Sequence, residues 1–255
     1  MLSPEGMAEM RASMDEYAPM EAEKWKKYTD LCEITEHKYN NSAGEATTFF
    51  EVRNKAHVGK KGLPAFIDFH GGGGYMGHAK EDLGLCSRLA LKADAVFFTL
   101  DYRLGPEVKA PTGALDAKCG IEHIISKADE FGIDKSKVST MGASGGGWIT
   151  LMASVFIGRE GKIKLKSMYL LSPMLDNTVA RRKFEEWEKF AERFVNEEFK
   201  LHATDFEKQD KENDLNLFPG RISQADAKTL PPTILQKSEF DMLRYDVDEI
   251  IPKLK

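Results

Sequence analysis

Residues 138–156, VSTMGASGGGWITLMASVF, carry the most informative pattern in the sequence. It begins as a short apolar run, passes through a turn of Gly, Ala and Ser, and continues as a helix-like apolar segment. A serine between small residues at a strand-to-helix turn can adopt a strained backbone that bulky neighbours would not allow. Its hydroxyl then projects at the carboxyl end of the strand, where the helix dipole favours negative charge. Ser144 is therefore a candidate nucleophile.

A second glycine motif lies upstream, where the apolar run 65–69 leads directly into His70-Gly71-Gly72-Gly73-Gly74. A loop without side chains exposes backbone N–H groups that can bind a developing oxyanion. Either motif alone is also compatible with a structural or phosphate-binding turn. No Lys-Ser or Lys-Thr follows the glycines, which argues against a P-loop, and the GxGxxG spacing of a dinucleotide fold is absent. The two motifs together, each after an apolar run, favour a nucleophile turn with its oxyanion loop.

Short apolar runs alternate with helical stretches outward from these motifs. This alternation predicts an α/β fold with a mostly parallel, doubly wound sheet. The expected strands are Thr47–Val52, Ala65–Phe69, Ala95–Leu100, Val138–Met141, Met168–Leu171 and Thr233–Gln236. The expected helices between them are Glu81–Leu91, Leu115–Glu130 and Trp148–Ile157.

Two further segments are expected to be helical and to lie outside the sheet. The first forty residues carry an apolar stripe that includes Met7, Met10 and Met14. Residues 178–220 are rich in charge and begin with aromatic residues at helical spacing, Phe184, Trp187, Phe190 and Phe194. The N-terminal segment could be a core helix or part of a lid. The insertion could cover the strand ends as a lid, and a helix that merely pads the surface is equally compatible with its pattern.

Composition limits the classes of partner. Lys+Arg number 36 against 41 Asp+Glu, a net charge of −5 without a long basic run, so neither nucleic acid nor an anionic membrane is expected as a partner. We find no apolar run long enough to span a membrane and no secretory signal. Three cysteines without a CxxC pair favour a reducing compartment, so a cytoplasmic location is expected.

The sequence resembles the hormone-sensitive-lipase-like branch of the α/β-hydrolases. Beyond the two glycine motifs, the resemblance is carried by DYRLGPE (101–107), Asp116, FGID (131–134), LSP (171–173), PPT (231–233) and EFDMLR (239–244). It implies an α/β-hydrolase core at 46–177 and 221–255. It also implies a helical cap made of the N-terminal segment 1–45 and the insertion 178–220.

The resemblance implies a serine carboxylester hydrolase for small or medium apolar acyl esters, without metal or organic cofactor. Ser144 would be the nucleophile, and the backbone amides of Gly72, Gly73 and Gly145 would form the oxyanion hole. Asp241 would be the triad acid that orients a histidine. From its residue type alone, Asp241 could instead cap the following helix. His70 would support the loop rather than act as the base.

The pattern departs from the family at the catalytic histidine, which should follow the acid in the chain. All six histidines precede Asp241, so we expect a member without the last strand and its base. His78 and His202 are possible substitutes, since each could approach the site. Poor ester hydrolysis is expected, with a non-catalytic, receptor-like small-molecule binder on the same fold as the alternative, and an amidase or deacetylase as a weaker one.

Three smaller expectations remain. Gly74 stands where the family commonly has an aromatic residue, and Trp148 occupies an unusual place just after the serine turn. These changes affect the expected shape of the acyl pocket, not the fold. A missing last strand would leave an unpaired sheet edge that favours association, although the sequence does not predict a particular oligomeric state.

Overall fold

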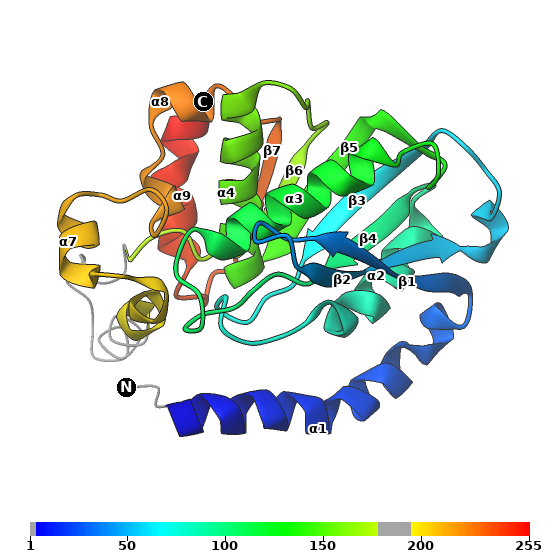
Figure 1. The fold of residues 1–255 in the computed structure, drawn as a ribbon, viewed down its shortest axis with the longest axis horizontal. Helices are drawn as coiled ribbons and strands as arrows, with labels where there is room; N and C mark the ends of the chain where they lie inside the picture. The colour runs from blue at the N-terminus through cyan, green and yellow to red at the C-terminus, as the bar shows by residue number, and fades with distance from the viewer. Residues whose placement is uncertain (1–3, 178–194) are drawn as a thin grey trace.

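A seven-stranded sheet lies at the centre of the computed structural model, which describes residues 4–177 and 195–255 (Figure 1). The strands are β1 (Cys32–Asn40), β2 (Ala46–Asn54), β3 (Leu63–Phe69), β4 (Val96–Leu100), β5 (Ile133–Ala143), β6 (Met168–Leu171) and β7 (Thr233–Gln236). Their order is β1-β2-β4-β3-β5-β6-β7. The pairs from β4 through β7 are parallel, whereas β2 is antiparallel to both β1 and β4. The predicted α/β class with a mostly parallel sheet is confirmed.

Helices cover both faces of this sheet. They are α1 (Pro4–Thr29), α2 (Leu83–Lys92), α3 (Thr112–Ser126), α4 (Gly145–Glu160), α7 (Phe206–Lys211), α8 (Gln224–Ala227) and α9 (Arg244–Leu254), with 3₁₀ turns η1 (Lys55–His57), η2 (Ala79–Asp82) and η3 (Pro219–Arg221) and a helical run at 195–202. Every residue of β4 is buried, as two covered faces require. Phe98 packs in the cluster that includes residues of α3 and α4, whereas its neighbour Phe97 packs with Cys86 and Ala90 of α2.

The sheet register brings four strand ends to one edge. Phe69 at the end of β3 pairs with Gly142, and Ala143 at the end of β5 pairs with Leu171 of β6. Leu171 in turn pairs with Gln236, the last residue of β7. Both glycine motifs and the chain that leads to Asp241 therefore leave the sheet at the same side, where ligands of parallel sheets bind.

The helical expectation for the first forty residues is wrong beyond Thr29. Residues 32–40 form β1, which pairs with β2 along nine residues. The turn between them contains Gly44 with a φ of 80°, a conformation suited to glycine. The error has a physical cause: Glu33, Glu36 and Lys38 give β1 a polar composition typical of a surface helix, and its pairing with β2 is a tertiary interaction.

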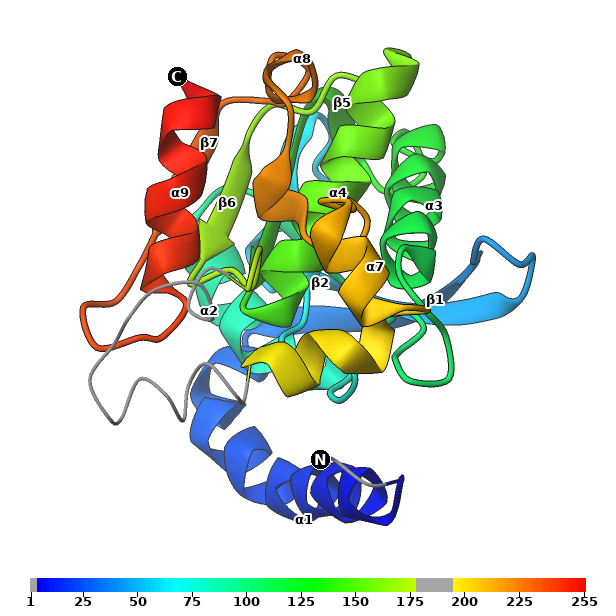
Figure 2. The ribbon, with the colours of Figure 1, turned by 90° about the vertical axis from the view of Figure 1, so that its left-hand side faces the viewer.

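The described part of the insertion contains helix but no strand. The predicted aromatic helix beginning at Phe184 lies outside the described residues. The helical run 195–202 buries Val195 and Phe199 in the main core. Figure 2 shows this run between the N-terminal half of α1 and the start of α4, where Trp148 contacts Phe199. Among the helices of residues 4–177 and 195–255, none has the length and apolar character needed to cross a membrane.

Candidate active site

The turn between β5 and α4 holds Ser144 in a left-handed backbone conformation, with φ 52° and ψ −122°. Such a conformation costs a non-glycine residue about 1–3 kcal/mol and persists only when the surroundings enforce it. Here the next turn of chain has no space for a side chain. A Cβ at Gly146 would stand 2.5 Å from the carbonyl oxygen of His70 and even closer to that of Phe69. Glycine at this position lets the turn pack directly against the end of β3.

Backbone hydrogen bonds fix Ser144 on both sides. Its N–H donates to the Leu171 carbonyl oxygen at 3.0 Å, and its own carbonyl oxygen accepts from Gly147 N at 2.9 Å and Met174 N at 3.0 Å. The residue is half-buried, and its hydroxyl makes no hydrogen bond within the described residues. The serine oxygen is therefore held in place with its proton free for a base or a ligand.

Three consecutive glycines form the facing loop. Gly72, Gly73 and Gly74 have φ values of 99°, 59° and 75°, which side chains rarely adopt. The loop closes as a turn, because the amides of Tyr75 and Met76 both donate to the Gly72 carbonyl at 3.0 Å. The amides of the three glycines themselves donate no hydrogen bond within the part of the chain that the structure describes. Unsatisfied amides of this kind are suited to bind an anion.

The loop and the serine turn are in direct contact. A Cβ placed on Gly145 would lie 2.6 Å from Gly74 N and 2.8 Å from Gly73 Cα. A Cβ on Gly71 would lie 3.8 Å from the Ser144 Cβ. Gly145 also begins α4, so its amide has no acceptor within that helix. The structure thus brings Gly73 and Gly145 together beside Ser144, although the catalytic roles of these residues remain predictions.

His70 lies at the base of the loop. Its ring is buried and stacks on Tyr102 at a centroid distance of 4.4 Å, and Nδ1 lies 2.8 Å from the Gly71 carbonyl oxygen. The Tyr102 hydroxyl donates to the His70 carbonyl oxygen at 2.8 Å. Burial lowers the pKa of His70 and so favours its neutral form. These contacts fit a supporting residue rather than a catalytic base.

Asp241 lies beyond β7, at the same edge of the sheet. Its Oδ1 accepts the backbone N–H of Leu243 at 2.9 Å, just before α9 begins. This contact over two residues is an Asx turn within the loop. The N-cap position of α9 is Leu243, which has no side-chain capping bond, so the alternative of Asp241 as a helix cap is wrong. The carboxylate is half-buried and makes no hydrogen bond to Ser144 in the described structure. The structure therefore supports a local structural role for Asp241 and does not test a role as the triad acid.

The two histidines considered as substitute bases make contacts with groups other than Ser144. His202 Nε2 lies 2.8 Å from the Gly73 carbonyl oxygen, and its ring contacts Trp148 edge-on at 4.6 Å. Burial lowers the pKa of His202 to about 4, so it is neutral at ordinary pH. His78 stands half-exposed with its Nε2 3.7 Å from Glu81. Neither is hydrogen-bonded to Ser144 within the described residues.

Glu198 is a site residue that the sequence reasoning missed. It is buried next to the glycine loop, where its Oε1 accepts the Tyr75 hydroxyl at 3.0 Å and would lie 3.1 Å from a Cβ on Gly73. Burial raises its pKa to about 7. One signal was available: Glu198 and His202 are four residues apart and share a helix face, which can reach a single loop.

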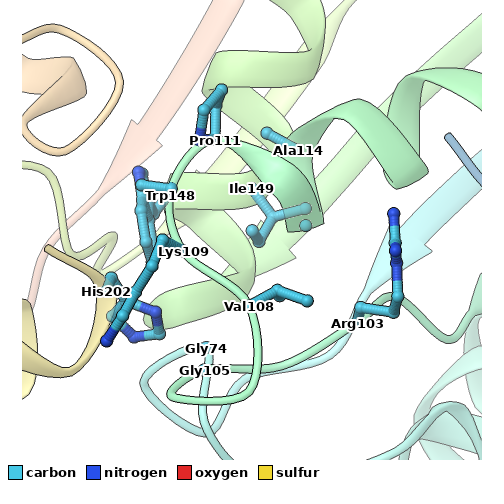
Figure 3. A pocket seen from close by; sticks show the side chains of 12 residues that line it. Gly74, Arg103, Gly105, Val108, Lys109, Pro111, Ala114, Trp148, Ile149 and His202 are labelled. Carbon is cyan, nitrogen blue, oxygen red and sulfur yellow. The ribbon is translucent and has the colours of Figure 1, made fainter. Parts of the chain in front are cut away.

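His202 and the chain around residues 103–114 line a small cavity (Figure 3). Its volume is about 10 Å³, and Gly74, Gly105, Trp148 and His202 are among its lining residues. That is the space of roughly one water molecule, far below the several hundred Å³ of a ligand pocket. Trp148 and His202 therefore fill this side of the loop, and an acyl group has no room here.

Comparison with known proteins decides the family. The family model described as the alpha/beta hydrolase fold matches residues 66–255, which is most of the chain. The chain belongs to the α/β-hydrolase family. Among solved structures, an esterase from Pyrobaculum calidifontis aligns with a TM-score of 0.84 and 21% identity over 97% of this chain and 79% of that one. A bacterial heroin esterase aligns with a TM-score of 0.83 and 22% identity, covering 97% and 78%. These likenesses show the fold.

Several curated relatives of this α/β-hydrolase are named esterases. An arylesterase of Saccharolobus solfataricus is 28% identical over 178 residues, 70% of this chain and 58% of the relative. A versiconal hemiacetal acetate esterase of Dothistroma septosporum is 29% identical over 206 residues, 74% of this chain and 60% of the relative. The chain therefore spans less than two thirds of the length of these relatives.

Proposed function

We propose that this α/β-hydrolase is a serine carboxylester hydrolase with Ser144 as its nucleophile. The observation that carries the proposal is the contact between the strained serine turn and three left-handed glycines whose amides have no acceptor in the described structure. A structural turn has no need for a row of unpaired amides beside a hydroxyl. The esterase names of the relatives support the same reaction class.

The reaction is an acyl transfer. Ser144 Oγ attacks the ester carbonyl carbon, and the carbonyl oxygen takes up negative charge against the amides of Gly72, Gly73 and Gly145. The C–O bond to the alcohol then breaks, the alcohol leaves with the proton that the serine gave up, and water hydrolyses the acyl-serine. Asp241 would act as the triad acid for an imidazole that carries this proton, a group that the described residues do not place in hydrogen-bond contact with Ser144. The cap over this edge would consist of residues 178–220 and of the helical part of the expected 1–45 segment, α1, because residues 32–40 of that segment belong to the sheet.

We further propose that these 255 residues alone turn over esters slowly. The six histidines all precede Asp241 in the sequence, and the described structure places none of them in hydrogen-bond contact with Ser144. Removing a triad histidine costs roughly 10⁶-fold in kcat in the serine protease subtilisin, although the oxyanion hole leaves a residual rate. This same observation favours the second candidate, a non-catalytic binder on the same scaffold.

The substrates we propose are small or medium apolar acyl esters, such as aryl and acetyl esters. Two named relatives act, by their names, on substrates of this kind. We propose a cytoplasmic location, for which the buried, unpaired thiols of Cys32 and Cys86 provide support.

The test measures hydrolysis of p-nitrophenyl butyrate and labelling by a fluorophosphonate probe, with Ser144→Ala as the matched control. An esterase site predicts labelling at Ser144 and slow turnover, both lost in Ser144→Ala. Absence of both signals in the wild-type chain, together with saturable binding of an uncleaved ester, would favour the binder.

A further inference from the structure

The glycine loop needs support from outside itself. Gly73 and Gly74 both lie in the left-handed region, and glycine occupies positive and negative φ with similar ease. A peptide unit between two such residues can therefore rotate at little cost. An oxyanion hole requires the opposite property, since its amides must point at one place before the reaction begins. Contacts from other parts of the chain must select the orientation.

His202 supplies one such contact. Its Nε2 lies 2.8 Å from the Gly73 carbonyl oxygen, and a carbonyl oxygen only accepts, so Nε2 carries the proton and donates. In a trans peptide the carbonyl of Gly73 and the N–H of Gly74 point in opposite directions. The nitrogen of Gly74 lies next to Gly145, 2.6 Å from the position of a Cβ there. A bond to the Gly73 carbonyl thus fixes the Gly73–Gly74 peptide plane, which also fixes the ψ angle of Gly73 and so restrains Gly73, whose own N–H is a proposed oxyanion donor.

The surroundings of His202 hold its ring in this position. The side chain is buried, its backbone carbonyl accepts Ala110 N at 3.0 Å, and its ring packs on Trp148. A Cβ at Gly105 would lie 2.5 Å from its Nδ1, and a Cβ at Gly74 would lie 3.1 Å from its Cε1. Small residues at both positions therefore make the room that the imidazole occupies (Figure 3).

Arg11 of α1 holds the other end of the same loop. Its Nε donates to the Tyr75 carbonyl oxygen at 2.8 Å, and Nη2 donates to the Gly105 carbonyl oxygen at 2.8 Å. Nη1 pairs with Glu107 at 2.8 Å, which fixes the guanidinium plane. Arg11 and His202 come from opposite ends of the sequence, and both also contact Gly105.

We propose that His202 and Arg11 are positioning residues that set the orientation of the oxyanion loop, His202 through the Gly73 carbonyl and Arg11 through the Tyr75 carbonyl. This inference rests on the proposed esterase function, because it concerns how the loop serves Ser144. Neither side chain reaches the reacting atoms in this role. The segments that carry Arg11 and His202 then not only cover the site but also hold the amides of the glycine loop in the orientation that binds the oxyanion.

The test compares two His202 variants in the full chain. His202→Phe keeps a ring against Trp148 and removes the donor, whereas His202→Gln removes the ring and keeps an N–H donor near the same place. For p-nitrophenyl butyrate, His202→Phe should lower kcat about tenfold to a hundredfold with KM within about twofold, the effect of a misplaced donor. His202→Gln should keep kcat within about threefold of wild type.

His57→Phe is the matched control. His57 is also buried, but it lies in η1 and pairs with Asp94 at 3.0 Å, far along the sheet from the loop. Its replacement should leave kcat unchanged at a temperature where all variants are folded. Arg11→Gln, which removes the forked contact to two carbonyls, should lower kcat about threefold to tenfold.

A readout that does not depend on turnover separates this inference from the proposed function. In protein labelled with ¹⁵N-glycine, the amide resonances of Gly73 and Gly74 should shift or broaden in His202→Phe and stay near their wild-type positions in His202→Gln. If the wild type shows no esterase activity, the proposed function is wrong. The resonances of Gly73 and Gly74 then test by themselves whether His202 positions the glycine loop. Unchanged resonances and an unchanged kcat in His202→Phe, or a loss in His202→Gln equal to that in His202→Phe, would overturn the proposal.

Discussion

The two ends of the candidate site differ in how strongly the fold determines them. At the nucleophile end, Ser144 is fixed by backbone bonds to β6 and to Met174, and its turn packs directly on the glycine loop. At the acid end, Asp241 lies in a turn next to Phe240, whose side chain is 88% exposed. The carboxylate of Asp241 accepts the amide of Leu243 and contacts neither Ser144 nor a histidine within the described residues.

This difference shows that the backbone at the sheet edge fixes the serine turn and the glycine loop, but not the carboxylate of Asp241. Three strand ends and two glycine motifs bring the Ser144 turn and the glycine loop into close backbone contact. An acid acts only through the imidazole that it orients. The backbone of these residues thus fixes the proposed nucleophile, whereas Asp241 is fixed only by its bond to the Leu243 amide.

The largest effect is expected at the nucleophile. Ser144→Ala removes the only atom of the proposed mechanism that forms a covalent bond, so fluorophosphonate labelling should fall by at least about 10³-fold. The α4 helix and the glycine loop should be unaffected, because Ala is small enough for the same turn. Labelling measured by intact-protein mass spectrometry checks this, and equal labelling of both proteins would show that another residue reacts.

The next effect concerns the contact between the serine turn and β3. Gly146→Ala places a methyl group against the carbonyl oxygens of Phe69 and His70, and backbone atoms cannot move aside cheaply. We expect a loss of about 3 kcal/mol in the free energy of unfolding, measured by urea denaturation. Gly161→Ala is the control, since Gly161 has φ 67° and open space around it, and it should lose only about 1 kcal/mol of backbone strain. Equal losses of unfolding free energy in Gly146→Ala and Gly161→Ala would show that the chain around Gly146 has room for a methyl group.

Glu198 should make the stability of the loop region depend on pH. Burial raises the folded-state pKa of Glu198 from the ordinary 4.5 to about 7. The contribution of Glu198 to the free energy of unfolding is therefore most favourable below pH 4.5. This contribution to the free energy of unfolding should be lost as the pH rises from about 4.5 through about 7, a decrease on the order of 3 kcal/mol. Glu198→Gln should remove this slope between pH 5 and pH 8 in urea denaturation.

The exposed Glu212→Gln serves as the control for Glu198 and should retain the wild-type slope. A Glu198→Gln curve with the same slope as the wild type would mean that Glu198 titrates as an ordinary surface carboxylate.

The smallest effect is expected at the acid end. Asp241→Ala removes the bond to Leu243 N and should lower the free energy of unfolding by about 1 kcal/mol, whereas Asp241→Asn keeps an acceptor and should lower it by less than about 0.5 kcal/mol. Neither variant should change the labelling rate of Ser144 by more than about threefold, because the described residues contain no imidazole hydrogen-bonded to Ser144 for it to orient. A loss of a hundredfold or more in Asp241→Asn at unchanged stability would show that Asp241 already acts on a base in this chain.

The sequence predicted what depends on local pattern. Every expected strand of the parallel part is present, because buried strands are short and apolar, and the glycine motifs appear at their ends. Strand β1 was missed, since its polar residues match a surface helix. Gly74 and Trp148 looked like isolated departures, but they belong to one packing arrangement around His202, where a Cβ at Gly74 would lie 3.0 Å from the Trp148 ring.

The spacing of Glu198 and His202 places them on one helix face, but the sequence does not show that this face, or Arg11, contacts the glycine loop. Arg11 and His202 are separated by most of the chain, and their partners are backbone carbonyls, which carry no residue-specific signal. Only the tertiary fold brings α1 and the run 195–202 to the same loop. Side-chain contacts with a main chain are therefore the part of this site that sequence reasoning misses most readily.

The most direct test of the central claim is a crystal structure of the covalent adduct between Ser144 and a fluorophosphonate. The phosphonyl oxygen stands where the ester oxyanion would be. We expect this oxygen within about 2.7–3.1 Å of the amides of Gly72, Gly73 and Gly145. A phosphonyl oxygen directed into solvent, away from the glycine loop, would contradict this expectation.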